Sequence, residues 1–172
     1  MKKQLLDAIL PVAFVLALAL SLISCSSETA EDLQQQTTTA VLVQDYDYSE
    51  NELELADLIN EHRTALGLNP LQTINHISYK SEEHNEYMIA NNVVNHDLFQ
   101  ERSQNIMEVL GAYKVNENVA YNYISSNAAL KAWLKSPGHK ANIEGDFTHF
   151  GISIRINPEN GKKYYTNIFI KK

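Results

Sequence analysis

Only one cysteine, Cys25, is present among the 172 residues, so no disulfide can form within the chain. A domain without disulfides must be stabilised by its hydrophobic core, and this length is sufficient for one domain of ordinary size. Clusters of lysine and arginine are also missing after the first residues, and the net charge is −7. Because nucleic acids are bound largely through positive charge, we expect no nucleic-acid partner.

Long apolar runs are limited to one, Ile9 to Ile23, which follows the basic start Met1-Lys2-Lys3. This run is typical of a signal peptide and is short for a membrane span. It ends in Leu22-Ile23-Ser24-Cys25, which resembles the lipobox of bacterial lipoproteins, where the cysteine is lipidated and becomes the mature N-terminus. We predict a lipoprotein signal peptide over residues 1–24 and a membrane anchor at Cys25. An ordinary cleaved signal, or an uncleaved anchor with an incidental cysteine, is the alternative.

The segment after Cys25 is polar and repetitive (SSETAEDLQQQTTT) and lacks apolar periodicity. This composition predicts a flexible tether over residues 25–48 and a folded domain over residues 49–172. A lipid anchor would hold the domain in the cell envelope, outside the cytoplasm. Glu28, Glu31 and Asp32 resemble the acidic export signals of some outer-membrane lipoproteins, which favours the outer membrane. The alternative is that these acids merely solvate the tether.

The domain combines helical and strand patterns. Ser49 and Glu52 fit a capping box that begins a helix ending near Gly67. Periodicity predicts further helices over Asn75–Asn91, Phe99–Leu110 and Asn127–Lys135, the last stopped at Ser136-Pro137-Gly138. It predicts strands over Val115–Tyr123, Phe150–Ile156 and Tyr164–Ile170, with a turn at 157–161. Since the last strand is apolar on both faces, we expect a small antiparallel sheet between two helical layers.

Charged and polar residues on apolar faces mark a candidate site. Glu117 shares the face of its predicted strand with Val115 and Val119. A carboxylate there must be paired, metal-bound or protonated, because an isolated buried charge is too costly. His139 stands just past the helix stop and can face this carboxylate. His84, on the inner face of the helix over Asn75–Asn91, is interpreted as a hydrogen-bonded core histidine rather than a ligand.

Five separated blocks of the chain match one family in order. They are Leu58-Ile59-Asn60-Glu61-His62-Arg63, Asn95-His96, Asn116-Glu117-Asn118-Val119-Ala120, Trp133 to Asn142 (WLKSPGHKAN) and Phe147-Thr148-His149-Phe150-Gly151. Together, over residues 50–171, they resemble the bacterial branch of the CAP superfamily, also called the SCP or cysteine-rich secretory protein/pathogenesis-related 1 domain. The resemblance implies a three-layer α/β/α sandwich, in agreement with the strand pattern.

The resemblance also implies a cleft. Better-known eukaryotic members carry two histidines and two glutamates there, and some hold a divalent metal. By position, His96 matches one of the two histidines and Glu117 matches one of the two glutamates. His139 belongs to a bacterial Ser-Pro-Gly-His block, and Asp146 stands where the second histidine is expected. No acid stands where the second glutamate is expected. These four residues are therefore the candidate cleft residues, and His96, Glu117 and His139 form a candidate ligand set for a divalent metal such as zinc.

A hydrogen-bonded polar cluster is the alternative to a metal site. In that interpretation His139 caps carbonyl groups at the helix end, while Glu117 accepts hydrogen bonds from backbone N–H groups and from His96. Tyr121 and Tyr123 could line the cleft, although aromatic residues of a strand often serve only packing.

Two functions are considered. The favoured one is a non-catalytic, membrane-anchored envelope module whose cleft binds a lipid or another envelope ligand, because some family members bind sterols or fatty acids and the fold carries no universal activity. The alternative is a metal-dependent hydrolase, a peptidase or esterase, with metal on His96 and His139 and with Glu117 as general base or third ligand. No His-Glu-x-x-His motif, nucleophile elbow or cysteine–histidine pair supports catalysis, so we lean toward a protein that is not an enzyme.

Overall fold

The computed structural model describes residues 40–172. The predicted signal peptide, the anchor at Cys25 and most of the predicted tether lie outside the described residues. In the described range the helices are α1 (Glu50–Ala65), α2 (Asn75–Asn91), α3 (Phe99–Leu110), α4 (Ser126–Lys135) and α5 (Pro137–Ile143). The strands are β1 (Gln72–Thr73), β2 (Lys114–Tyr121), β3 (His149–Ile156) and β4 (Lys163–Lys171). No helix between residues 40 and 172 has the length and apolarity needed to cross a membrane.

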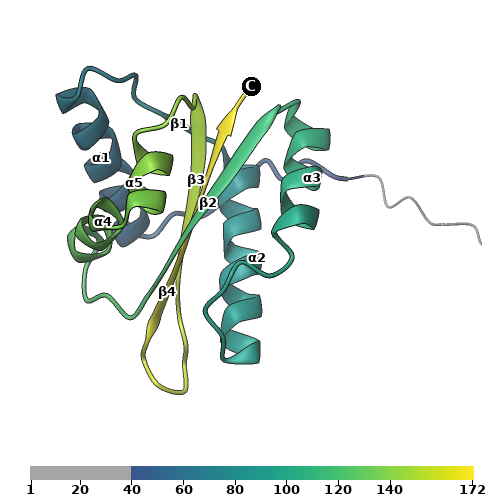
Figure 1. Ribbon diagram of the computed structural model, residues 1–172. Coiled ribbons are helices and arrows are strands. Elements are labelled where there is room, and N and C mark those ends of the chain that lie inside the picture. Colours follow the sequence, from purple (N-terminus) through teal and green to yellow (C-terminus); the bar gives the residue numbers. More distant parts are fainter. Residues whose placement is uncertain (1–39) are drawn as a thin grey trace, which may run out of the picture. The chain divides into compact units, whose positions relative to one another are not determined.

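The sheet lies between two helical layers, with strand order β1-β3-β4-β2. Helices α1, α4 and α5 cover one face, and α2 and α3 cover the other (Figure 1). The predicted three-layer α/β/α fold is therefore confirmed. β4 pairs antiparallel with both β2 and β3, while the short β1 pairs parallel with β3. The sequence analysis did not predict β1, because two residues are too few to show an alternating pattern.

Strand β4 is buried on both faces, as predicted, and it separates two cores. Tyr165 and Phe169 pack on the side of α1 and α4, with Leu55 and Trp133 among their neighbours. Ile168 and Ile170 pack on the opposite side, in a second cluster with residues of α2 and α3. Burial on both faces explains why apolar residues stand on both faces of this strand, on either side of the buried polar pair Thr166 and Asn167.

The helix boundaries follow local signals. The capping box predicted for α1 is present, since Ser49 Oγ accepts from the Glu52 N–H and the Glu52 carboxylate accepts from the Ser49 N–H. Helix α4 ends at Lys135 as predicted, but the segment after it differs from the expectation. Pro137 does not leave His139 in a loop but begins α5, of which His139 is the third residue. A proline fits the first helical position because its fixed φ suits the helix and its missing N–H is not needed there.

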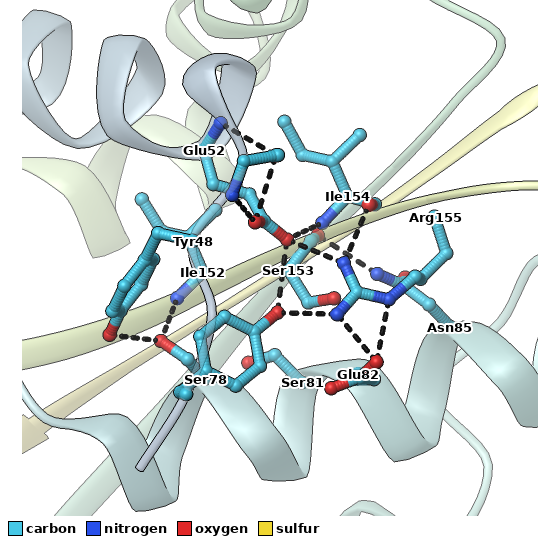
Figure 2. A network of polar contacts seen from close by, with 12 residues as sticks. Tyr48, Glu52, Ser78, Ser81, Glu82, Asn85, Ile152, Ser153, Ile154 and Arg155 are labelled. Atoms are coloured by element: carbon cyan, nitrogen blue, oxygen red, sulfur yellow. Dashed lines mark hydrogen bonds and ion pairs between the residues drawn. The ribbon is translucent and has the colours of Figure 1, made fainter.

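The outer edge of β3 is closed by side chains rather than by a full-length strand (Figure 2). Beyond β1, the Ile152 N–H donates to Ser78 Oγ at 3.0 Å, and the Ile154 N–H donates to Glu52 Oε1 at 2.7 Å. This arrangement needs α2 very close to the strand. A Cβ added to Gly151 would collide with the backbone nitrogen of Ser78, so only glycine allows this approach.

Glu52 joins three parts of the chain. Its side chain is fully buried and accepts from the Ile154 N–H, from Arg155 Nη1 at 2.8 Å and from the Tyr46 hydroxyl at 3.0 Å. It also caps the first turn of α1. A buried carboxylate is tolerated when its charge is paired and its lone pairs are hydrogen-bonded, and both conditions are met here.

We predict that Glu52→Gln destabilises the protein by about 1–3 kcal/mol, because the buried Ile154 N–H and the partly buried Arg155, which keeps its pairing with Glu82, lose their shared charged acceptor. The free energy of unfolding from chemical denaturation measures this loss. Glu50→Gln is the matched control, since Glu50 lies in the same helical turn but is exposed. Equal stabilities of the two variants would contradict the role assigned to Glu52.

Candidate functional site

The candidate site is built around the Glu117 carboxylate of β2. Its side chain is 2% exposed and receives two hydrogen bonds from Arg102 Nη2 of α3, at 3.0 Å to Oε1 and 2.8 Å to Oε2, and a third from Arg102 Nε at 3.1 Å. A planar guanidinium matches a carboxylate in this two-pronged geometry. Three states were considered for this inward carboxylate: paired, metal-bound or protonated. The described residues contain the paired state, with Arg102 as the partner.

His96 is the second residue of the cluster. Its Nδ1 lies 2.8 Å from Glu117 Oε1, and its side chain is 52% exposed. Since a carboxylate paired with arginine can only accept, the hydrogen lies on Nδ1, and Nε2 of the neutral ring is the free acceptor. Glu117 therefore fixes both the tautomer and the orientation of an imidazole that faces solvent.

His84 of α2 lies behind this pair. Its Nε2 is 3.7 Å from Glu117 Oε1 but donates to the Asn95 carbonyl at 2.9 Å, so it supports the loop that carries His96. Burial lowers the pKa of His84, and the nearby Glu117 charge opposes that shift. Within residues 40–172 its buried Nδ1 has no hydrogen-bond partner. The prediction of a core histidine therefore agrees with its complete burial.

His139 approaches the cluster from the other helical layer. Burial lowers the pKa of His139, and the charge of His96 lowers it further. Helix α5 is tied to β2 by two amide side chains: Asn118 Nδ2 donates to the His139 carbonyl at 3.0 Å, and Asn142 Nδ2 donates to the Glu117 carbonyl at 3.2 Å. The expected capping by the His139 ring is not seen within residues 40–172; its backbone carbonyl is the bonded group instead.

Asp146 is not brought to this cluster. It is 77% exposed and pairs with Lys171 Nζ at 2.5 Å, at the end of β4. This pairing lowers the pKa of its carboxyl group. The structure therefore pairs His96 with Glu117 and places His139 on α5, which is tied to β2. Asp146 lies elsewhere, paired with Lys171.

A cleft of about 360 Å³ opens beside His139. It runs along β2 between α4 and the link from α2 to α3, and its lining combines apolar and aromatic side chains with polar groups. The lining residues are Val94, Val119, Ala120, Tyr121, Tyr123, Ala132, Trp133, Ser136 and His139. Tyr121 and Tyr123 thus line a cleft, one of the two roles considered for them. The cleft can accept an apolar group at one end and a polar group at the histidine end.

The donor atoms do not fit a divalent metal well. Both Glu117 oxygens accept from Arg102, whose positive charge would repel a second cation at the same carboxylate. Among residues 40–172 no group of three or more histidine, cysteine, aspartate or glutamate side chains has the arrangement of a metal site. The zinc set of His96, Glu117 and His139 stays a prediction for direct measurement.

Arg102 is the site residue that the sequence analysis did not assign. A signal was present, because Arg102 shares the inner face of α3 with Ile106, four residues later. An arginine on an apolar face requires a carboxylate or several carbonyl groups. Which acid it meets depends on how α3 crosses β2, and no local pattern gives that information.

The family model for the cysteine-rich secretory protein family (CAP) matches residues 56–169. Two Bacillus subtilis proteins are similar to the chain over 128 residues. The uncharacterized membrane protein YlbC is 33% identical, over 71% of this chain and 35% of its own length. The uncharacterized protein YkwD is 30% identical, over 72% of this chain and 48% of its own length. The chain thus spans half or less of each relative.

Solved structures share the fold. An outer surface protein from Borrelia burgdorferi superposes with a TM-score of 0.66 at 23% identity, over 74% of this chain and 96% of its own. An extracellular protein containing an SCP domain from Bacillus anthracis gives a TM-score of 0.63 at 26% identity, over 74% of this chain and 45% of its own. Both are surface or extracellular proteins by name.

We predict that Arg102→Leu destabilises the protein by about 3–5 kcal/mol, since it leaves the Glu117 carboxylate buried without its counter-charge. Combining it with Glu117→Leu should recover part of this loss, because the double variant buries no unpaired charge. Chemical denaturation measures both, and Glu101→Leu, an exposed neighbour, is the control. A single variant as stable as the parent would show that the ion pair has no structural role.

Proposed function

The chain belongs to the cysteine-rich secretory protein (CAP) family, and we propose that it acts outside the cytoplasm as a non-catalytic binding module. In this proposal the cleft along β2 takes the apolar part of a lipid or another amphiphilic envelope ligand. His139 and the exposed Nε2 of His96 contact its polar end. The domain is held in the envelope by a lipid on Cys25, through the polar segment that follows it.

The observation that carries this proposal is the bonding of Glu117. Its two oxygens accept three hydrogen bonds from Arg102 and one from His96. Both oxygens of this carboxylate are therefore already engaged by the guanidinium and the imidazole. Its role is to orient His96, not to take a proton from water or from a substrate.

The metal-dependent hydrolase considered from the sequence requires the opposite arrangement. Glu117 would have to be free to act as general base or as a third ligand beside His96 and His139. Arg102 occupies that position on the carboxylate, and no observation in the described residues favours the hydrolase. The binding interpretation is therefore preferred.

An envelope location is supported by the sequence near Cys25 and by the relatives. One relative is called a membrane protein, one structural neighbour an outer surface protein and another an extracellular protein. An apolar cleft on a lipid-anchored domain would lie near a source of amphiphilic molecules. We propose the outer membrane as the site of the anchor.

We predict that a brominated fatty acid quenches the fluorescence of Trp133 in a saturable way. Trp133 is the only tryptophan of the chain and lines the cleft, so its emission reports directly on occupancy. Ala132→Phe should reduce the apparent affinity by filling the cleft. Ala128→Phe, one turn away on α4 and outside the lining, is the matched control. Quenching that does not saturate, or that is equal in both variants, would contradict a ligand in this cleft.

A calorimetric zinc titration tests the alternative. We expect no stoichiometric binding at micromolar zinc, because Arg102 neutralises the only carboxylate of the predicted ligand set. His96→Ala and His139→Ala are measured beside the parent protein. Tight binding that is lost in both variants would establish a shared metal site and would favour the hydrolase over the binding module.

A further inference from the structure

The segment that precedes α1 is bonded to the domain. We propose that residues 43–48, here called the strap, form a pH-sensitive latch: the strap is docked on α2 while His76 is neutral, and it is released when His76 takes up a proton. The contacts of Val43 with His76 carry this inference. It does not depend on the ligand of the cleft.

His76 is the second residue of α2 and is fully buried. Its Nδ1 lies 3.1 Å from the Val43 backbone nitrogen, and its Nε2 lies 2.8 Å from Asn105 Oδ1 of α3. A backbone N–H can only donate, so Nδ1 must accept and the hydrogen of the neutral ring lies on Nε2. The docked strap therefore requires one protonation state and one tautomer of His76.

The other contacts of the strap do not depend on a group that titrates near neutral pH. Asn75 Nδ2 donates to the Gln44 carbonyl at 2.6 Å, and the Tyr48 hydroxyl lies 2.8 Å from Ser78 Oγ. Figure 2 shows Tyr48 beside Ser78, whose hydroxyl also accepts from Ile152. At the other end the Tyr46 hydroxyl donates to Glu52. Among these bonds, the one to Val43 alone involves an imidazole.

Protonation would place a second N–H at Nδ1, directed at the Val43 N–H, so the hydrogen bond would become a repulsion. The surroundings give little compensation. Burial lowers the pKa of His76, the bond to Asn105 raises it, Lys80 lowers it and Glu83 raises it. The position at the N-terminus of α2 also disfavours a cation. The carboxylates of the strap itself, Asp45 and Asp47, are exposed.

The direction of the pH effect follows from this. Burial lowers the pKa of His76 while the strap is docked. In this proposal release exposes the ring to water, so its pKa returns toward about 6.5, the value of an unperturbed histidine. Docking is therefore at full strength above about pH 6.5 and weakens as the pH falls below it. Release of the strap would lengthen the segment before α1 by about 20 Å when extended. If the domain is anchored at Cys25, as the proposed function has it, release of the strap increases the distance that the domain can reach from the membrane.

Hydrogen–deuterium exchange of the full chain in detergent tests the latch, with rates corrected for the intrinsic pH dependence of exchange. We expect the protection of the strap amides to fall by about tenfold or more between pH 7.5 and pH 5, while α1 and β4 keep theirs. His76→Asn, which keeps an acceptor near the position of Nδ1, should show the same protection at both pH values. His149→Asn is the matched control, since His149 lies at the start of β3 and should leave the fall unchanged.

Three results would overturn the proposal. The first is parent protein with equal strap protection at both pH values. The second is a His76→Asn variant whose strap protection falls with pH as much as that of the parent. The third is loss of protection in α1 and β4 together with the strap, which would indicate global unfolding. If His76→Asn fails to fold, an NMR pH titration of the parent protein replaces it. The proposal requires that the chemical shift of the His76 imidazole and the signals of the released strap change with the same midpoint pH, and two different midpoints would overturn it.

Discussion

A four-stranded sheet leaves two edges, and the backbone groups along them must find hydrogen-bond partners away from bulk water. In this domain side chains supply many of those partners. At the β3 edge, Ser78 and Glu52 accept from the backbone N–H groups of alternate residues. At the β2 edge, Trp133 Nε1 donates to the Val119 carbonyl at 3.0 Å, and Asn142 donates to the Glu117 carbonyl. The helices must therefore stand where their side chains reach the edges, and this fixes both helical layers.

Two buried carboxylates obey the same constraint. Glu52 pairs with Arg155 and joins α1 to β3, while Glu117 pairs with Arg102 and joins β2 to α3. Desolvating such pairs costs nearly as much as their attraction returns, so their main effect is to make one arrangement of the elements preferable to others. This has a direct consequence for chemistry. The charge of Glu117 positions α3 and His96, and both of its oxygens already accept hydrogen bonds from them.

Most helices and strands of this fold could be predicted from local sequence patterns. The hydrogen-bond partners of the site residues could not. Helix α1, with its capping box, and helix α2, with its periodic inner face, begin and end close to the predicted residues, because these signals are local. Alternation placed Glu117 inside. The pairing of Glu117 with Arg102 depends on how α3 crosses β2, and a short stretch of sequence does not contain that information. The resemblance to the family suggested Asp146 by its position, yet its side chain pairs with Lys171 outside the cluster, because sequence position does not fix the direction of a side chain.

The closed edge of β2 bears on what the cleft can recognise. A peptide added as a further strand would need the outward carbonyl groups of β2 as acceptors. Those of Glu117 and Val119 already accept from Asn142 and Trp133. Recognition must then come from side chains, with Tyr121 and Tyr123 along the cleft and His139 at its end. Such a lining fits a compact ligand with an apolar body and one polar end better than an extended polypeptide, and this is a second reason to prefer a binding module over a peptidase.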